Sequence, residues 1–301
     1  MDQKNTLKAW LYLLPAIVLL GVFMIYPLVD VLIYSLEENF NTATQTYTGV
    51  GIENYAHVFN DAEFFSALKN TFIMVIITVP LSTLIALGLA VGLNAINPLK
   101  KVFQTIFFVP YVTNTLAVGL VFMLVFAYNP PSNYGLFNTF LSWFRIPAVD
   151  WISADAPYAA KMFVLCFYVI WTVMPFKVIV LIGALQGVNK DYYKAASIDG
   201  ASRFRKFSKI TVPMISPMIS YLVITGFIGA FKEYNNAVAL FGSDLTKAGM
   251  NTIVGYVYTN IYSDTGGYPS YAAAAAIALF MIVLAITAIN LVVSQKKVYY
   301  N

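Results

Sequence analysis

The chain has 301 residues, of which 59% are hydrophobic and only 11% charged, and its net charge is +4. Because about a quarter of the residues in soluble globular domains are charged, this composition indicates a membrane protein that crosses the bilayer several times. The small net charge gives no support to nucleic-acid binding, and a single cysteine (Cys166) and a single histidine (His57) argue against a disulfide framework or a metal centre.

Six apolar runs are each long enough for the roughly 20 residues that a bilayer crossing needs. They cover approximately residues 8–34, 68–95, 102–127, 157–185, 212–231 and 269–293. Prolines inside several runs predict kinked helices, because proline removes a backbone donor; these are Pro15, Pro27, Pro80, Pro110 and Pro175. We therefore expect an all-α membrane protein with six transmembrane helices, in which residues 1–301 form a single transmembrane domain.

The positions of lysine and arginine predict the orientation in the membrane. Twelve of the 18 basic residues lie in the two terminal segments and in the second and fourth connections, six of them between Lys190 and Lys209. The first connection instead carries five acidic residues and no basic residue before Lys69. Both termini and the fourth connection are therefore expected to face the cytoplasm.

The fourth connection, residues 189–213, has the pattern of a compact helical hairpin. Asn189 can cap a first helix, and Gly200 can end it in the left-handed conformation. Ser202 can cap a second helix, and Pro213 permits a bend into the next span. A basic loop that only follows the positive-inside rule would explain the charge but not these caps and this turn. We expect the hairpin to dock into a partner protein.

The hairpin sequence resembles a known motif. Ala195-Ala-Ser-Ile-Asp-Gly-Ala201, followed by Ile210-Thr-Val-Pro213, is similar to the EAA motif of ABC importer permeases. Further segments resemble the binding-protein-dependent sugar permeases of the maltose and glycerol-phosphate type; these are residues 109–111, 171–176, 185–188, 245–252 and 256–258. The resemblance runs from about the first span to the C-terminus. It implies the fold of a type I ABC importer permease.

In the resembling family this motif forms a coupling helix that fits a cleft of a cytoplasmic ATPase. The coupling residues that the resemblance implies are Lys194, Ala195, Ala196, Asp199, Gly200, Ala201, Arg203, Phe204 and Pro213. Two places depart from the family: Lys194 stands where the motif has glutamate, and the outer loop reads Ala248-Gly249-Met250 where the family has Gly-Gly-Pro. We therefore expect an acidic or neutral ATPase surface opposite Lys194.

Candidate substrate residues come from the third, fourth and fifth runs, where polar and aromatic side chains could meet sugar hydroxyls and rings. The positions that the resemblance implies are Tyr111, Thr115, Val173, Gly229, Glu233 and Asn236. Residues 232–236 have an alternative interpretation, in which they only mark the outer end of the fifth span. Lys177 is expected to extend its amine to the inner lipid headgroups, as lysines in membrane helices commonly do.

The sequence has no GxxxxGK[ST] phosphate-binding loop, because no glycine is followed by lysine. The chain is therefore not expected to be an enzyme or to bind a cofactor. The resemblance implies that two ATPase subunits hold ATP and magnesium, that a second homologous permease subunit completes the pore, and that an extracellular binding protein delivers the cargo. The expected function is import of a carbohydrate, an oligosaccharide, across the cytoplasmic membrane of a bacterium or archaeon.

Three alternatives stay open. The importer could carry a non-sugar solute such as glycerol phosphate. An ion-coupled secondary transporter would be expected to show acidic residues in mid-span, but Asp30 is the only acid in the first four runs and lies near an outer end. A membrane enzyme would need a clustered nucleophile, base or metal set, and the sequence shows none.

Overall fold

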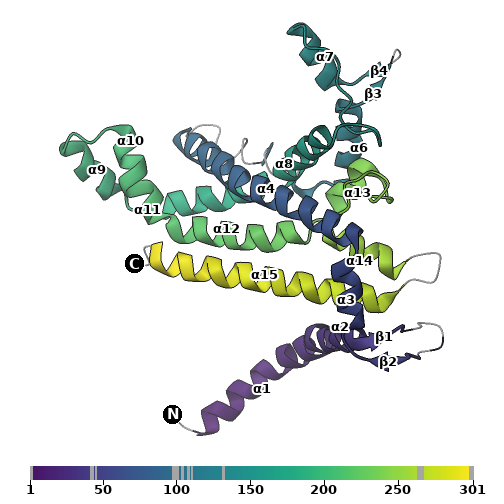
Figure 1. Ribbon diagram of the computed structural model, residues 1–301. Helices are drawn as coiled ribbons and strands as arrows, with labels where there is room; N and C mark the ends of the chain where they lie inside the picture. Colours follow the sequence, from purple (N-terminus) through teal and green to yellow (C-terminus); the bar gives the residue numbers. More distant parts are fainter. Residues whose placement is uncertain are drawn as a thin grey trace. The chain divides into compact units, whose positions relative to one another are not determined.

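The computed structural model describes residues 3–40, 44, 46–96, 102, 105–106, 109, 111–130, 133–262 and 268–297. These residues are mostly helical and form two compact units (Figure 1). The first unit comprises residues up to 65 together with 256–281, and the second comprises 66–255 together with residues from 282 onward. The organisation of the whole chain as one permease domain stays a prediction.

The first unit is built on two consecutive helices and a short antiparallel hairpin. Its elements are α1 (Gln3–Leu20), the π-helical turn η1 (Gly21–Ile25), α2 (Tyr26–Leu36), β1 (Glu37–Glu38), β2 (Gly49–Val50) and α3 (Glu53–Asn60), with parts of α14 (Ile253–Ile261) and α15 (Pro269–Lys297). Asn54 ties α3 to the end of α2, because its amide donates to the Ser35 and Glu37 carbonyls, 3.0 Å in each case. Burial and a hydrogen bond to Asp61 raise the pKa of Tyr256, which therefore stays protonated.

The second unit contains the remaining helices. They are α4 (Ala62–Ala95, which begins in the first unit), α6 (Thr115–Val125), α7 (Leu136–Trp143), α8 (Tyr158–Gly187), α9 (Lys190–Ile198), α10 (Arg203–Lys206), the π-helical turn η2 (Phe207–Thr211), α11 (Val212–Met214), α12 (Ser216–Phe231) and α13 (Asn235–Phe241). A second hairpin pairs β3 (Tyr128–Asn129) with β4 (Asn133–Tyr134). Figure 1 shows α9 and α10 at one end of α8 and α12, with α13 at the other end.

Four helical stretches among the described residues are long and apolar enough to cross a membrane. They are Lys8–Leu36, Ala62–Ala95, Tyr158–Gly187 and Pro269–Gln295. A fifth crossing is formed if Arg203–Met214 and Ser216–Phe231, which meet at 65°, count as one span. Five residues of the expected third span (102–127), Pro110 among them, lie outside the described residues, and α6 covers only Thr115–Val125 of it. The count of six and the cytoplasmic termini therefore stay predictions.

The core of the second unit lies where α4, α8 and the start of α12 meet. Small residues of α4 allow this close approach, because Ala86 and Ala90 have no exposed surface. Opposite them, α8 contributes Val178, Leu181 and Ile182 to the same buried cluster. Protein interiors are packed like crystals and transmit strain, so this cluster makes α4, α8 and α12 move together.

A buried polar network holds the segment before α14 against α4 and α8. The Asn70 amide donates to the carbonyls of Gly249 (3.2 Å) and Asn251 (2.9 Å), and its oxygen accepts from the Tyr158 hydroxyl (2.9 Å). The buried amine of Lys161 donates to the carbonyls of Ala154 (2.9 Å) and Ala248 (2.7 Å). The loop is therefore fixed by side chains that replace its missing backbone partners.

Replacing Asn70 by Leu should destabilise this end of the molecule, because two carbonyls and the partly exposed Tyr158 phenol lose the hydrogen-bond partner that the buried Asn70 amide supplies. We expect a loss of about 2–4 kcal/mol. Tyr158→Phe is the matched control, since it removes only one of the three hydrogen bonds. The measurement is the thermal unfolding midpoint of the purified protein, and equal midpoints for the two variants would contradict the network's role.

Candidate functional site

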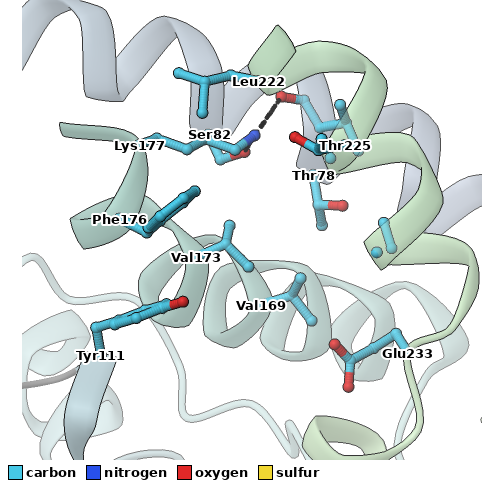
Figure 2. A pocket seen from close by; sticks show the side chains of 14 residues that line it. Thr78, Ser82, Tyr111, Val169, Val173, Phe176, Lys177, Leu222, Thr225 and Glu233 are labelled. Carbon is cyan, nitrogen blue, oxygen red and sulfur yellow. Dashed lines mark hydrogen bonds between the residues drawn. The ribbon is translucent and has the colours of Figure 1, made fainter. Parts of the chain in front are cut away.

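A cavity in the second unit is enclosed by α4, α8 and α12 (Figure 2). The residues that line it include Thr78 and Ser82 of α4, Val173 and Lys177 of α8, and Thr225 of α12. A second cavity adjoins it and shares three lining residues, Tyr111, Val173 and Glu233. Two apolar helices, α4 and α12, thus carry hydroxyl groups where they line the cavity.

All six residues predicted for substrate contact line one or both cavities. Gly229 lines the first; Thr115 and Asn236 line the second; Tyr111, Val173 and Glu233 line both. The structure therefore brings these sequence-distant positions together. Residues 232–236 follow the end of α12 and lead into α13. Within them, Glu233 and Asn236 also line the second cavity.

Glu233 and Asn236 hold each other in place. One Glu233 oxygen accepts from the Asn236 backbone N–H and the other from the Asn236 side-chain amide, both at 2.9 Å. Apolar surroundings raise the pKa of the Glu233 carboxyl, and these hydrogen bonds oppose the rise. The Asn236 amide also donates to the Thr172 hydroxyl (3.4 Å), whereas its buried Oδ1 has no partner within the described structure. Such a buried acceptor is free for a ligand hydroxyl.

Two aromatic rings stand beside this polar group. Tyr111 and Phe176 stack with ring centroids 5.6 Å apart and planes 20° apart. Both rings keep more than a third of their surface exposed. An aromatic face next to hydrogen-bonding groups suits a molecule that has apolar faces and polar edges, and a sugar ring has this shape.

The expectation that Lys177 reaches the lipid headgroups is wrong. Its side chain is only 4% exposed, and its amine points into the contact between α8 and α4. There it donates to the hydroxyls of Ser82 (2.7 Å) and Thr83 (2.9 Å) and to the Val79 carbonyl (3.4 Å). Lys177 would need an open path to the membrane surface to reach the headgroups. Instead, its amine is buried and bonded to two hydroxyls of α4.

The hairpin formed by residues 189–213 is the second candidate site, and its local structure is as the sequence predicts. The Asn189 side chain accepts from Asp191 N–H (2.9 Å), which caps α9. Gly200 has a φ of 72°, the left-handed conformation that ends α9. The Ser202 hydroxyl accepts from Arg205 N–H (3.3 Å) and caps α10.

The free surface of the hairpin carries two large apolar side chains. Ile198 is 87% exposed and Phe204 is 77% exposed. Phe204 is exposed, whereas Phe207 and Ile210, three and six residues further on, are partly buried in the π-helical turn η2. Exposed apolar side chains beside basic ones are typical of a surface that another protein covers.

Lys194 has a partner within its own helix. Its amine lies 2.9 Å from an Asp191 oxygen, and both side chains are largely exposed. The charge that distinguishes this motif from its family thus has an acidic neighbour, although an exposed pair of this kind contributes little free energy. The expected acidic or neutral partner surface opposite Lys194 stays a prediction.

The hairpin is connected to the core through its inner face. The Tyr193 hydroxyl hydrogen-bonds the Thr211 hydroxyl (2.9 Å), joining α9 to η2. Tyr193 and Met214 pack against the buried cluster of α4, α8 and α12. The hairpin is therefore in direct contact with helices that line the cavity.

Comparison with known proteins agrees with this arrangement. Residues 84–298 match the family described as binding-protein-dependent transport system inner membrane component. The chain belongs to this family. It is 28% identical to the arabinooligosaccharides transport system permease protein AraP of Bacillus subtilis, over 95% of this chain and 88% of that one. It is 29% identical to the trehalose/maltose transport system permease protein MalF of Thermococcus litoralis, over 99% and 97%.

The fold of this permease is that of a solved transporter subunit. A chain in the crystal structure of a bacterial alginate ABC transporter, in complex with an alginate pentasaccharide-bound periplasmic protein, superposes with a TM-score of 0.77. The match covers 95% of this permease and 93% of that chain at 22% identity. The chain is therefore an all-α ABC permease of the type I importer fold.

Several residues of this permease's cavity were missed by sequence reasoning. Thr78, Ser82 and Thr225 lie inside apolar runs, where a hydroxyl at one position gives no sign of the direction it faces. Membrane helices carry serine and threonine on many faces because these side chains can bond the preceding turn. Only their coincidence with a lysine at mid-span could have indicated a polar site.

Gly200→Val should weaken coupling in this permease. No atom would meet the added side chain, so the penalty comes from a backbone conformation that a β-branched residue avoids, about 1–2 kcal/mol. Gly200→Asn is the control, since asparagine tolerates this conformation. We expect several-fold slower uptake and weaker ATPase co-purification for the valine variant only. Normal values for both quantities would contradict a docking role for the hairpin.

Asn236→Ala should lower the sugar-stimulated ATP turnover of the assembled transporter about tenfold. The change removes the buried amide oxygen that would accept from a ligand hydroxyl, and it removes the side-chain hydrogen bond to Glu233. Asn290→Ala removes an amide from α15, outside both cavities, and should leave turnover unchanged. Stimulation of the Asn236 variant at the wild-type level across a panel of sugars would remove this residue from the site.

Proposed function

We propose that this permease translocates a carbohydrate, an oligosaccharide, through its membrane cavity, driven by ATP hydrolysis in partner subunits. Relatives whose names specify cargo include permeases for arabinooligosaccharides, for trehalose and maltose, for lactose and for sulfoquinovosyl glycerol. The cavity chemistry agrees with such cargo, because hydroxyls, an unpartnered amide oxygen and two exposed aromatic rings gather in one place. In this proposal the substrate contacts are Tyr111, Thr115, Val173, Gly229, Glu233 and Asn236.

The hairpin is proposed to be the point at which energy enters. Its exposed Ile198 and Phe204 would sit in a groove of a cytoplasmic ATPase, and Gly200 and Asp199 would form the turn between them. When the ATPase subunits close on ATP, they would displace the hairpin together with the residues that anchor it. The chain itself would bind neither ATP nor magnesium.

The remaining partners follow from the same proposal. A second, homologous permease subunit would complete the pathway, and two ATPase subunits would each receive one hairpin. An extracellular binding protein would deliver the cargo to the outer connections. Support comes from the structural neighbour, which was solved with a periplasmic protein that carries an alginate pentasaccharide. We place both termini and the hairpin on the cytoplasmic side of a bacterial or archaeal membrane.

One observation carries the proposal. The single continuous helix α8 lines the cavity with Val173 and Lys177, and it continues to the connection that begins the hairpin. The buried cluster between these two regions contains Leu181, Ile182 and Leu185 of the same helix. Substrate contacts and partner contacts are therefore two ends of one rigid element.

The experiment is uptake by proteoliposomes that contain the chain with its partner permease and ATPase. We expect accumulation of a labelled oligosaccharide that requires ATP inside, magnesium and the binding protein outside. A variant ATPase that binds but does not hydrolyse ATP should abolish accumulation. Transport by this chain alone under an ion gradient would contradict the proposal and favour a secondary transporter.

A further inference from the structure

We propose that the end of the cavity formed by Lys177, Ser82 and Thr78 binds an anionic group of the carbohydrate, a carboxylate, phosphate or sulfonate. This inference rests on the proposed function and names the class of substrate. It adds a binding position on α4 and on the inner part of α8, apart from the six residues considered above. The argument depends on what surrounds the Lys177 amine.

The Lys177 amine has hydrogen bonds but no counter-charge. Its three acceptors are the Ser82 and Thr83 hydroxyls and the Val79 carbonyl, all of them neutral. Within the described residues, the ion pair is that of Lys194 with Asp191 (2.9 Å), which lies in the hairpin and not at Lys177. A buried ammonium group without an anion is costly in the membrane, and such residues commonly mark a ligand pathway.

The amine has room to receive a ligand. Its contact with the Val79 carbonyl is 3.4 Å, much longer than the 2.7 Å contact with Ser82, so this weak bond can be exchanged for a charge-assisted one. On the α12 side the amine faces Gly226, which has no side chain there; a Cβ at this position would lie 3.4 Å from Nζ. Thr225 and Gly226 both line the cavity at this point.

A second polar residue of α4 lines the same cavity. Thr78 is 1% exposed, lines the cavity, and its hydroxyl has no hydrogen-bond partner within the described structure. Buried hydroxyls are almost always paired, so an orphan beside an uncompensated cation indicates a missing acceptor. An anionic oxygen would accept from both groups at once.

The opposite end of the cavity would orient such a ligand. Figure 2 shows Lys177, Ser82 and Thr225 at one end and Tyr111 and Glu233 toward the other. Both oxygens of Glu233 are occupied by Asn236, yet the carboxyl would still repel an anion. The anionic group therefore belongs at the Lys177 end, and the neutral sugar face belongs beside Tyr111 and Phe176.

The test measures binding to the purified complex of this chain, its partner permease and the ATPase, without ATP and without the binding protein. Two matched pairs of probes are used: trigalacturonate with its carboxyl-reduced trisaccharide, and trehalose 6-phosphate with trehalose. We expect at least one acidic probe to bind about tenfold or more tightly than its neutral partner. The two pairs distinguish a carboxylate from a phosphate as the preferred group. Equal binding within both pairs, or no binding of any probe, overturns the proposal.

Variants assign the preference to this end of the cavity. Lys177→Met should abolish it and Lys177→Arg should retain it, while Lys232→Met, which removes an exposed positive charge, should leave it unchanged. If the methionine variant does not assemble, Thr78→Val tests the proposal instead. It should weaken the binding of the acidic probe several-fold more than the binding of the neutral probe. An unchanged preference in Lys177→Met or Thr78→Val overturns the proposal. ATP-driven uptake of neutral sugars alone would refute this inference and leave the proposed function intact.

Discussion

Charged and polar groups inside the membrane must find their partners within the protein, because the hydrocarbon offers none. The contact between α4 and α8 shows how this chain meets that requirement. Two hydroxyls and a carbonyl of α4 surround one lysine amine of α8, and two alanines one or two turns further along let the helices approach closely. The cavity, the packing of α12 and the connection to the hairpin all depend on this contact.

Helix α8 joins the two regions of functional interest because it is long and unbroken. It runs through Pro175 without interruption, although an internal proline removes one backbone hydrogen bond. In a membrane such a proline is tolerated when neighbouring groups satisfy the freed backbone. The result is a helix with a polar stretch beside the cavity and an apolar stretch in the core, and both stretches shift together.

Features that depend on local sequence were predictable. The caps at Asn189 and Ser202 and the turn at Gly200 follow from side chains that act within three residues of themselves, and the structure confirms all three. The approximate positions of the long apolar helices follow from length and composition, and four of them are found close to the expected bounds. The six cavity positions were found through family resemblance, since no local rule unites residues so far apart.

Features that depend on tertiary contacts were not predictable in the same way. Lys177 was expected at the lipid surface, because a sequence shows that a lysine is long enough to snorkel but not that two hydroxyls of another helix lie nearer. Phe204 is exposed although Phe207, three residues further on, is partly buried, because burial depends on the neighbours that each ring meets. The unpaired hydroxyl of Thr78 could not be predicted, because showing that a group has no partner requires the positions of all its neighbours.

The 65° bend between Arg203–Met214 and Ser216–Phe231 has a geometric consequence for how movement is converted. When two rigid arms meet at such an angle, the larger component of a displacement along the first arm is perpendicular to the second. A push on the hairpin along its own axis therefore acts on α12 mainly as a sideways thrust and only weakly as axial sliding. Sideways motion of a wall changes the width of a passage, whereas sliding would change only which residues face each other across it.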